Sequence, residues 1–277
     1  MSGTDLTFIR RERKYIILEH TFDQIIKEIE KHIPVYTFQG GPNLTNIETT
    51  YLDTTDFLLF HEYLNQRSFR YKIRLRRYGS NGIFEPRYLV ELKIKHKSIS
   101  SKKRFVLPEE LLDDLLNGVT ILQQVKVANK GLIGAQKTYK IIAKLIKLNE
   151  FVPILRSSYE RISFQKKSKR VRITVDNKIT HTGLLGKEKQ ETLDATVLES
   201  KIMGKSPKWH KKMVNRLSLL RQRRFSKFAT GMNSIYFPDR GKYNFYGDDS
   251  FEQPEIPQKI IDSFELLKKS FKLDDEI

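Results

Sequence analysis

Residues 70–76 read Arg70-Tyr71-Lys72-Ile73-Arg74-Leu75-Arg76, a run in which a cation occupies every second position and the residues between are apolar. In a β-strand, residues i and i+2 lie on the same face, so this run would have one ionic and one apolar side. Charged and apolar residues also alternate in three more runs: Leu89-Val90-Glu91-Leu92-Lys93-Ile94-Lys95, Arg170-Val171-Arg172-Ile173-Thr174-Val175-Asp176 and Val197-Leu198-Glu199-Ser200-Lys201-Ile202. These runs predict a sheet whose charged faces converge on a polyanion.

The overall charge also favours an anionic partner. The chain has 277 residues and a formal net charge of +18, from 51 Lys and Arg against 33 Asp and Glu. A charge of this size favours nucleic acid, phosphorylated small molecules, polyphosphate or an acidic membrane surface as the partner. Charge alone does not choose among them, and a basic surface that only keeps the protein in solution is the plain alternative.

Composition excludes several classes of protein. Hydrophobic residues make up 39% of the chain, with 12 Tyr and 17 Phe, as in a folded protein. Cysteine is absent, so a disulfide framework and a thiolate metal site are both excluded. No apolar stretch approaches the roughly 20 residues that cross a bilayer. Residues 1–5 lack the apolar region of a signal peptide, so a cytoplasmic location is the default expectation.

Hydrophobic periodicity predicts a mainly β chain with several helices. Strands are expected near residues 8–19, 46–52, 68–78, 87–97, 101–107, 153–165, 169–177 and 194–203. Helices are expected near 23–33, 55–65, over most of 108–149 and after Pro207. Residues 231–255 have an irregular composition, and 256–271 have the apolar spacing of an amphipathic helix. We expect one main domain over 1–230, with 231–277 packing on it.

Two architectures suit strands with one ionic and one apolar face. An open antiparallel sheet would turn its ionic face to water. A closed barrel would hold a charged lumen, with helices packed on its apolar exterior. The in-phase charged positions exceed what a solvated face requires. We therefore predict an α+β fold built on an antiparallel β-barrel of about eight strands, with the helices outside.

A series of motifs in a fixed order then resembles a known family. The motifs are Arg10-x-Glu12-x-Lys14-Tyr15, Tyr51-Leu52-Asp53, Ile73-Arg74-Leu75-Arg76-Arg77-Tyr78-Gly79, Val90-Glu91-Leu92-Lys93, Lys102-Lys103-Arg104-Phe105, Tyr159-Glu160-Arg161, Val171-Arg172-Ile173-Thr174-Val175-Asp176, Leu198-Glu199-Ser200-Lys201 and Phe225-Ser226-Lys227-Phe228. Over residues 8–230 the chain resembles the polyphosphate polymerase domain of the vacuolar transporter chaperone (VTC) family, a branch of the triphosphate tunnel metalloenzymes. No single motif is specific for this family, but the nine motifs in this order are specific together.

The resemblance implies a function. It implies a tunnel that binds a triphosphate and a divalent cation, Mn²⁺ or Mg²⁺, and that transfers the γ-phosphoryl of ATP onto a growing polyphosphate chain, releasing ADP. ATP and inorganic polyphosphate would then be the partners. Nucleic acid is not expected, because the residues between the charges are aliphatic and not base-stacking aromatics. The eukaryotic members add a phosphate-sensing domain and membrane helices that this sequence lacks, so we expect a stand-alone form with a separate membrane partner.

The resemblance also assigns roles to individual residues. Those matched to the reacting phosphates are Arg74, Arg76, Lys93, Arg172 and Lys227. Those matched to substrate binding are Glu12, Lys14, Glu91, Lys102, Arg104, Arg161 and Lys201. Glu199 matches the metal carboxylate. Two alternatives stay open: Glu91 and Lys93 could form only a cross-strand ion-pair ladder, and Glu199 could pair only with a lumen cation.

Two other functions compete with polyphosphate synthesis. One is hydrolysis of tripolyphosphate or nucleoside triphosphates on the same fold. Hydrolytic relatives usually open with Glu-x-Glu-x-Lys, whereas this chain has Arg10 in place of the first Glu, and this difference favours the polymerase branch. The other is a binder of polyphosphate without catalysis, because a shared fold does not establish turnover.

Overall fold

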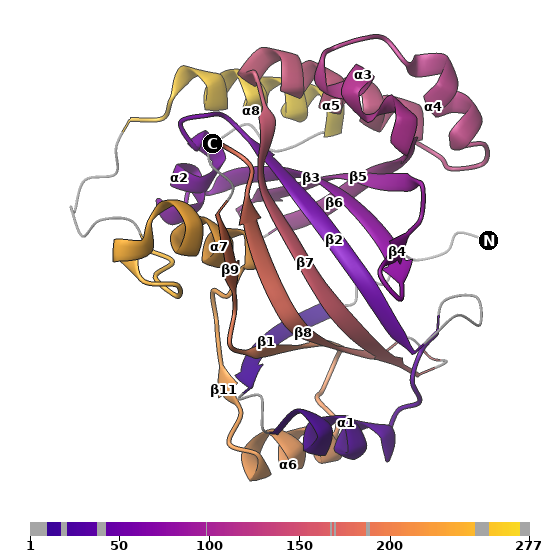
Figure 1. The fold of residues 1–277 in the computed structure, drawn as a ribbon, viewed down its shortest axis with the longest axis vertical. Coiled ribbons are helices and arrows are strands. Elements are labelled where there is room, and N and C mark those ends of the chain that lie inside the picture. The colour runs from indigo at the N-terminus through magenta and orange to yellow at the C-terminus, as the bar shows by residue number, and fades with distance from the viewer. Residues whose placement is uncertain are drawn as a thin grey trace.

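The computed structural model describes residues 10–17, 21–37, 43–97, 99–166, 168, 170–186, 189–246 and 255–271. In this part of the chain, all strands join one antiparallel sheet of 11 strands (Figure 1). The order of the sheet is β11-β1-β10-β8-β7-β2-β3-β5-β6, with β4 paired to β3 and β9 paired to β8. Arg10 belongs to β1, but its side chain lies outside the described part of the structure.

Eight of these strands are long and correspond to the predicted ones. They are β1 (Arg10–Ile17), β2 (Leu44–Asp53), β3 (Phe69–Ser80), β5 (Arg87–His96), β6 (Ile99–Pro108), β7 (Val152–Gln165), β8 (Val171–Gly183) and β10 (Thr196–Met203). The three short strands are β4 (Ile83–Phe84), β9 (Gln190–Thr192) and β11 (Leu220–Arg221), which periodicity did not predict. The alternation in β3 is as expected, since Phe69, Ile73 and Leu75 are buried away from the charged face, and Tyr71 is buried too, although it also reaches the cavity lining.

The described sheet is not a closed barrel, which differs from the sequence-based prediction. Its two edge strands, β6 and β11, are not paired with each other. The sheet nevertheless curls. Side chains of β1 and β5, which are not neighbours in the sheet, line the same cavity. After β11 pairs with β1, the chain crosses toward β3, where Ser226 contacts Lys72. Residues 221–228 therefore lie between the two sides of the sheet, where barrel closure would need strand-to-strand hydrogen bonds.

Helices cover the outer, apolar face of the sheet in two groups (Figure 1). The first group packs on β3, β5 and β6 and comprises α3 (Leu112–Leu116), α4 (Leu122–Ala128), α5 (Ala135–Asn149) and α8 (Gln258–Phe271). The second group packs on β1, β8 and β10 and comprises α1 (Phe22–Glu30) and α6 (Lys208–Arg216). No helix in the described ranges is long and apolar enough to span a bilayer.

The predicted C-terminal helix, α8, packs on the body of the protein. Phe264 and Leu267 are buried in the same apolar cluster as β3, and the Tyr71 hydroxyl lies 2.9 Å from the Ser263 hydroxyl. The predicted division at residue 230 falls inside α7 (Lys227–Tyr236), which is buried along most of its length. The described parts of the tail are thus packed continuously with the sheet.

One buried carboxylate fixes the chain where β2 meets α2 (Leu58–Leu64). Asp53 accepts hydrogen bonds from the backbone N–H groups of Thr54 at 2.8 Å, Leu59 at 2.8 Å and Phe60 at 3.0 Å. The N–H groups of Leu59 and Phe60 are donors that a helix N-terminus otherwise leaves without partners. The motif residue Asp53 therefore has a structural role, and it orients α2, whose Tyr63 reaches the cavity described below.

We expect Asp53→Ala to lower the free energy of unfolding by about 3 kcal/mol or more, because it leaves three buried N–H groups without an acceptor. Urea unfolding measures the change. The matched control is Asp56→Ala in the exposed turn that follows β2, which should change stability by less than about 0.5 kcal/mol. Equal losses in the two variants would contradict this role.

Candidate functional site

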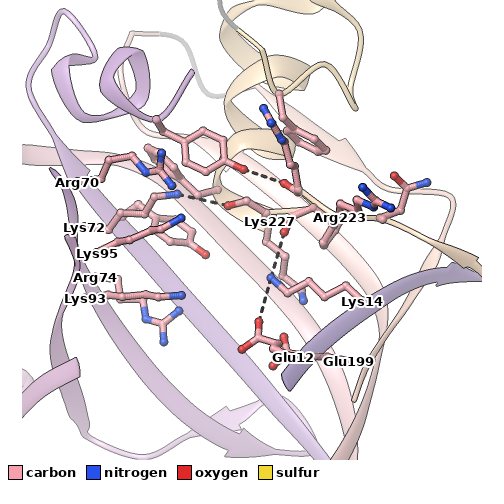
Figure 2. A pocket seen from close by; sticks show the side chains of 18 of the residues that line it. Glu12, Lys14, Arg70, Lys72, Arg74, Lys93, Lys95, Glu199, Arg223 and Lys227 are labelled. Atoms are coloured by element: carbon pink, nitrogen blue, oxygen red, sulfur yellow. Dashed lines mark hydrogen bonds and ion pairs between the residues drawn. The ribbon is translucent and has the colours of Figure 1, made fainter. Parts of the chain in front are cut away.

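The curled sheet lines an open cavity of about 670 Å³ (Figure 2). Three structures line it: a wall from β3 and β5, a wall from β1 and β10, and residues 221–228, here called the cover segment. Tyr51 of β2 and Tyr159 and Arg161 of β7 lie between the two walls. The charged residues of the lining are Glu12, Arg13, Lys14, Arg70, Lys72, Arg74, Arg76, Lys93, Lys95, Arg161, Glu199, Lys201, Arg221, Arg223, Arg224 and Lys227.

The β3–β5 wall carries a ladder of cations. Along β3 every second residue from Arg70 to Arg76 enters the cavity lining, as the alternation of the strand requires. The register places Lys72 directly opposite Lys93, and Arg70 opposite Lys95, both on β5. Like charges directly opposite on paired strands destabilise a sheet. This arrangement is expected where the strands hold the charges together for an anion.

Glu91 of β5 supplies a counter-charge at one end of this wall. Its carboxylate lies 2.7 Å from Arg74 Nε, 2.7 Å from Lys102 Nζ and 3.9 Å from Arg76 Nη1. Burial raises the pKa of Glu91, but the charges of Arg74 and Arg76 and the Lys102 hydrogen bond outweigh burial and lower it to about 2. Glu91 is 1% exposed and does not line the cavity. Glu91 therefore forms cross-strand ion pairs, as the alternative from the sequence had it, but with Arg74 and Lys102, and Lys93 takes no part in these pairs.

The β1–β10 wall holds both carboxylates of the described lining, Glu12 and Glu199. Lys14 Nζ lies 3.5 Å from Glu12 Oε1, and Lys201 Nζ contacts both Glu12 Oε2, at 3.6 Å, and Glu199 Oε1. Burial raises the pKa of Glu199, but the charges of Lys14 and Lys201 outweigh burial and hold it well below its usual value. Glu199 is therefore ionised at neutral pH.

A buried carboxylate of β8 holds the residues between the two walls. Asp176 accepts from Arg161 Nε at 2.5 Å and Nη2 at 2.8 Å, and from Lys227 Nζ at 2.5 Å. Burial raises the pKa of Asp176, but Arg161 and Lys227 lower it below its usual value. Since Lys227 is the first residue of α7, this carboxylate fixes where the helix begins relative to β7.

The cover segment is tied to both walls. Lys14 Nζ donates to the Phe225 carbonyl at 3.0 Å, and the Tyr63 hydroxyl donates to the Arg224 carbonyl at 2.8 Å. Lys72 Nζ lies 3.4 Å from the Ser226 hydroxyl and 4.0 Å from the centre of the Tyr63 ring. Burial and the nearby charges of Lys93 and Lys14 hold the pKa of Lys72 well below its usual value. An anion in the cavity would relieve this repulsion.

The structure brings most of the predicted site residues together. Nine line the cavity: Glu12, Lys14, Arg74, Arg76, Lys93, Arg161, Glu199, Lys201 and Lys227. Four do not: Glu91, Lys102, Arg104 and Arg172. Lys102 and Arg104 are exposed on the edge strand β6, and Arg172 lies opposite Lys201 in the register, beyond the cavity lining. The catalytic, binding and metal roles of all thirteen residues stay predictions.

Several lining residues were not assigned by sequence reasoning. Lys72 and Arg70 share the parity of Arg74, and Lys95 shares that of Lys93, so the alternation contained the signal that would have found them. The aromatic residues Tyr51, Tyr63 and Tyr159 carried no such signal. The sequence also could not show that residues 224–228 reach the ionic face, but in the structure they do.

The donor set of the cavity fits a hard divalent cation held mainly by its substrate. In the described residues, no group of three or more His, Asp or Glu side chains could hold a metal ion. The lining carboxylates Glu12 and Glu199 carry oxygen atoms, the type of ligand that Mg²⁺ and Mn²⁺ prefer, and both are paired with lysines in this structure. Mg²⁺ is commonly bound by one or two carboxylates together with phosphate oxygens and water.

Comparison with known proteins identifies the family. The VTC domain family model matches residues 9–236 of the chain. Vacuolar transporter chaperone complex subunit 4 of Trypanosoma brucei brucei (strain 927/4 GUTat10.1) is 24% identical over 279 residues, covering 83% of this chain and 35% of that protein. Subunit 2 of the complex in Schizosaccharomyces pombe (strain 972 / ATCC 24843) is 27% identical over 187 residues, covering 61% of this chain and 25% of that protein.

The chain therefore belongs to the VTC domain family, which confirms the resemblance seen in its motifs. It spans about a third of the length of the subunit 4 relatives that it matches, 35% and 34%. Among solved structures, a putative adenylate cyclase from Bacillus halodurans aligns with a TM-score of 0.44 and 16% identity, over 78% of this chain and 94% of that one. The PH1819 protein from Pyrococcus horikoshii OT3 aligns with a TM-score of 0.41 and 13% identity, over 79% of this chain and 96% of that one.

We expect Glu91→Gln to destabilise the protein by about 3 kcal/mol at neutral pH, because the half-buried Arg74 and the buried Arg76 lose their counter-charge. Since folding lowers the pKa of Glu91 from 4.5 to about 2, its contribution is complete above pH 4.5 and is lost as the pH falls through 2. The difference between wild type and variant should shrink over that range in urea unfolding. Glu85→Gln, which breaks the exposed pair with Arg87, is the control; a pH-independent difference would contradict the assignment.

Proposed function

We propose that the protein is a polyphosphate polymerase that transfers the γ-phosphoryl group of ATP onto a growing inorganic polyphosphate chain and releases ADP. The observation that carries the proposal is the cavity itself. Cations from β1, β3, β5, β7, β10 and the cover segment face one cavity that has only two carboxylates among its described lining residues. Membership of the VTC domain family supports the same chemistry.

The residue types suit two condensed phosphates held side by side. Arg74, Arg76 and Arg161 offer planar guanidinium groups that can bind phosphate oxygens in pairs, while Lys14, Lys93 and Lys201 act as point charges. Donor and acceptor repel each other strongly, so their approach requires cations on several sides. The two walls supply cations from opposite directions, and the cover segment adds more from between them (Figure 2).

The reaction needs neither a protein nucleophile nor a general base. The ionised terminal oxygen of the acceptor chain attacks the γ-phosphorus of ATP, forming a new anhydride bond. The bond between the γ-phosphorus and the oxygen that bridges to the β-phosphorus breaks, and ADP leaves with the electron pair. Catalysis of phosphoryl transfer rests mainly on positioning and on stabilising charge. Glu199 and Glu12 would hold Mg²⁺ or Mn²⁺, which would neutralise charge on the phosphate oxygens.

The relatives are named as subunits of a complex, which supports the expectation of a protein partner. We propose that the chain works with a separate membrane protein. The partner would receive the polyphosphate product, since the chain must leave the cavity as it grows. Co-purification from cells that make the protein at its natural level tests this part of the proposal.

Incubation of the purified protein with ATP and Mn²⁺ tests the proposed activity. We expect two products: ADP, and phosphate chains longer than the triphosphate of ATP. A gel separates these chains by size. Free phosphate without chains would indicate a hydrolase in which water replaces the acceptor. Tight binding of tripolyphosphate without nucleotide turnover would indicate a binder without catalysis. Either of these results would contradict the polymerase.

Lys93 gives a variant that separates function from folding. It lines the cavity, and no ion pair or hydrogen bond of its side chain is present among the described residues. We expect Lys93→Ala to lower the rate of ADP release about a hundredfold, the usual loss for one positioned charge-stabilising group, while thermal stability is unchanged or slightly higher. Lys178→Ala, on an exposed pair with Glu160, is the control for charge. An unchanged rate would remove Lys93 from the site.

A further inference from the structure

The connection between α4 and α5 holds apolar side chains out in water. Ile133 is 100% exposed, Val127 is 79% exposed and Leu132 is 40% exposed. We call these three residues the α4–α5 tip. Leu132 and Ile133 lie in the turn that joins α4 to α5, and Val127 lies in the last turn of α4, on a part of the molecule that Figure 1 shows opposite α1 and α6. Exposed apolar surface rimmed by polar residues marks contact sites.

The tip is held rigidly in this position. The Asn129 side chain accepts from the Val106 N–H at 2.7 Å and donates to the Val106 carbonyl at 2.7 Å, which anchors the turn to β6. Backbone hydrogen bonds join Leu132 N–H to the Asn129 carbonyl at 2.9 Å, and Ala135 N–H to the Leu132 carbonyl at 3.3 Å. Gly131 and Gly134 adopt φ values of 83° and 82°, which glycine adopts without strain. The sequence thus builds a defined turn around two exposed aliphatic residues.

The charge around the tip has one sign. Lys130 lies within the turn, Lys126 lies four residues before it along the chain, and Lys137 lies four residues after Ile133. All three are exposed, and none forms an ion pair among the described residues. From residue 115 to residue 149 the chain contains no Asp or Glu. The three cations, here called the tip lysines, therefore flank the apolar side chains in the sequence without neutralisation from this stretch, and Lys137 Nζ lies 5.7 Å from the centre of the Phe271 ring of α8.

We propose that the α4–α5 tip docks on an anionic lipid surface, with its aliphatic side chains in the acyl boundary and the tip lysines among the headgroup phosphates. Lysines near an anionic leaflet are attracted to it, and their stems can lie along apolar surface while the ammonium groups reach the phosphates. A protein partner fits less well, because a stable protein interface takes about 20–30 residues a side. A projecting turn with three aliphatic residues is too small to form its core.

This surface is separate from the cavity, and none of the tip residues lines it. Docking would hold the polymerase proposed above at a membrane without covering the cavity residues of β1 and β10. The docking itself does not depend on the polymerase activity. Its test uses no nucleotide, so a failed polymerase assay would leave it standing.

Sedimentation with vesicles tests the proposal. The full chain is mixed with vesicles of phosphatidylcholine alone or of phosphatidylcholine with phosphatidylserine, at physiological ionic strength. We expect binding to the phosphatidylserine vesicles and little to the others. Because the net charge of +18 attracts any anionic surface, the deciding variant must be neutral. Ile133→Ser should lower the partition coefficient about tenfold or more, as expected when an isoleucine side chain no longer enters an apolar phase.

Ile83→Ser is the matched control, because Ile83 is 78% exposed at the β3–β4 turn and lies outside the tip. It should bind as the wild type does. Lys130→Gln should weaken binding roughly fivefold. Since Ile133 is fully exposed, its variant should keep the melting temperature of the wild type. Equal binding by the two Ser variants would show attraction by net charge alone and overturn the proposal. Absence of vesicle binding, or loss of it to an acidic protein competitor, would do the same.

Discussion

Electrostatic repulsion among the cations of the cavity is the constraint on which the structure depends. Lys72 and Lys93 are directly opposite on paired strands, and Lys14 faces them across the cavity. Such an arrangement is unfavourable without an anion, so the backbone hydrogen bonds of the sheet and its apolar outer face must hold it. Helices supply this support, since α5 and α8 bury the outer face of β3 and β5, and α1 and α6 bury that of β1 and β10.

The carboxylates divide into two kinds by position. Glu91 and Asp176 are almost completely buried, and each is shared by two or more cations. They reduce repulsion within the protein and orient the arginines. Glu12 and Glu199 instead line the cavity, where a divalent cation bound to phosphate could reach them. The cavity thus keeps a large excess of positive charge, which suits condensed phosphate better than a nucleotide monophosphate or a single carboxylate.

Alternation in the sequence predicted which face each charged residue takes, and hence most of the cavity. It could not predict which positions along each strand reach the cavity. Arg172 of β8 and both Lys102 and Arg104 of β6 lie outside the lining, because register and edge position decide which residues converge. Parity also could not distinguish Glu91, an internal counter-charge, from Glu199. The sequence predicted a closed barrel, whereas the cover segment lies between the two walls. The cover segment has no periodicity from which this position could be inferred.

A crystal structure with tripolyphosphate bound tests most directly the claim that distant strands form one site for condensed phosphate. The expected result is a single ordered ligand in the cavity, in contact with Arg74 or Lys93 of one wall and with Lys14 or Lys201 of the other. Ligand bound only at outer basic surfaces such as α6, with the cavity unchanged, would contradict it.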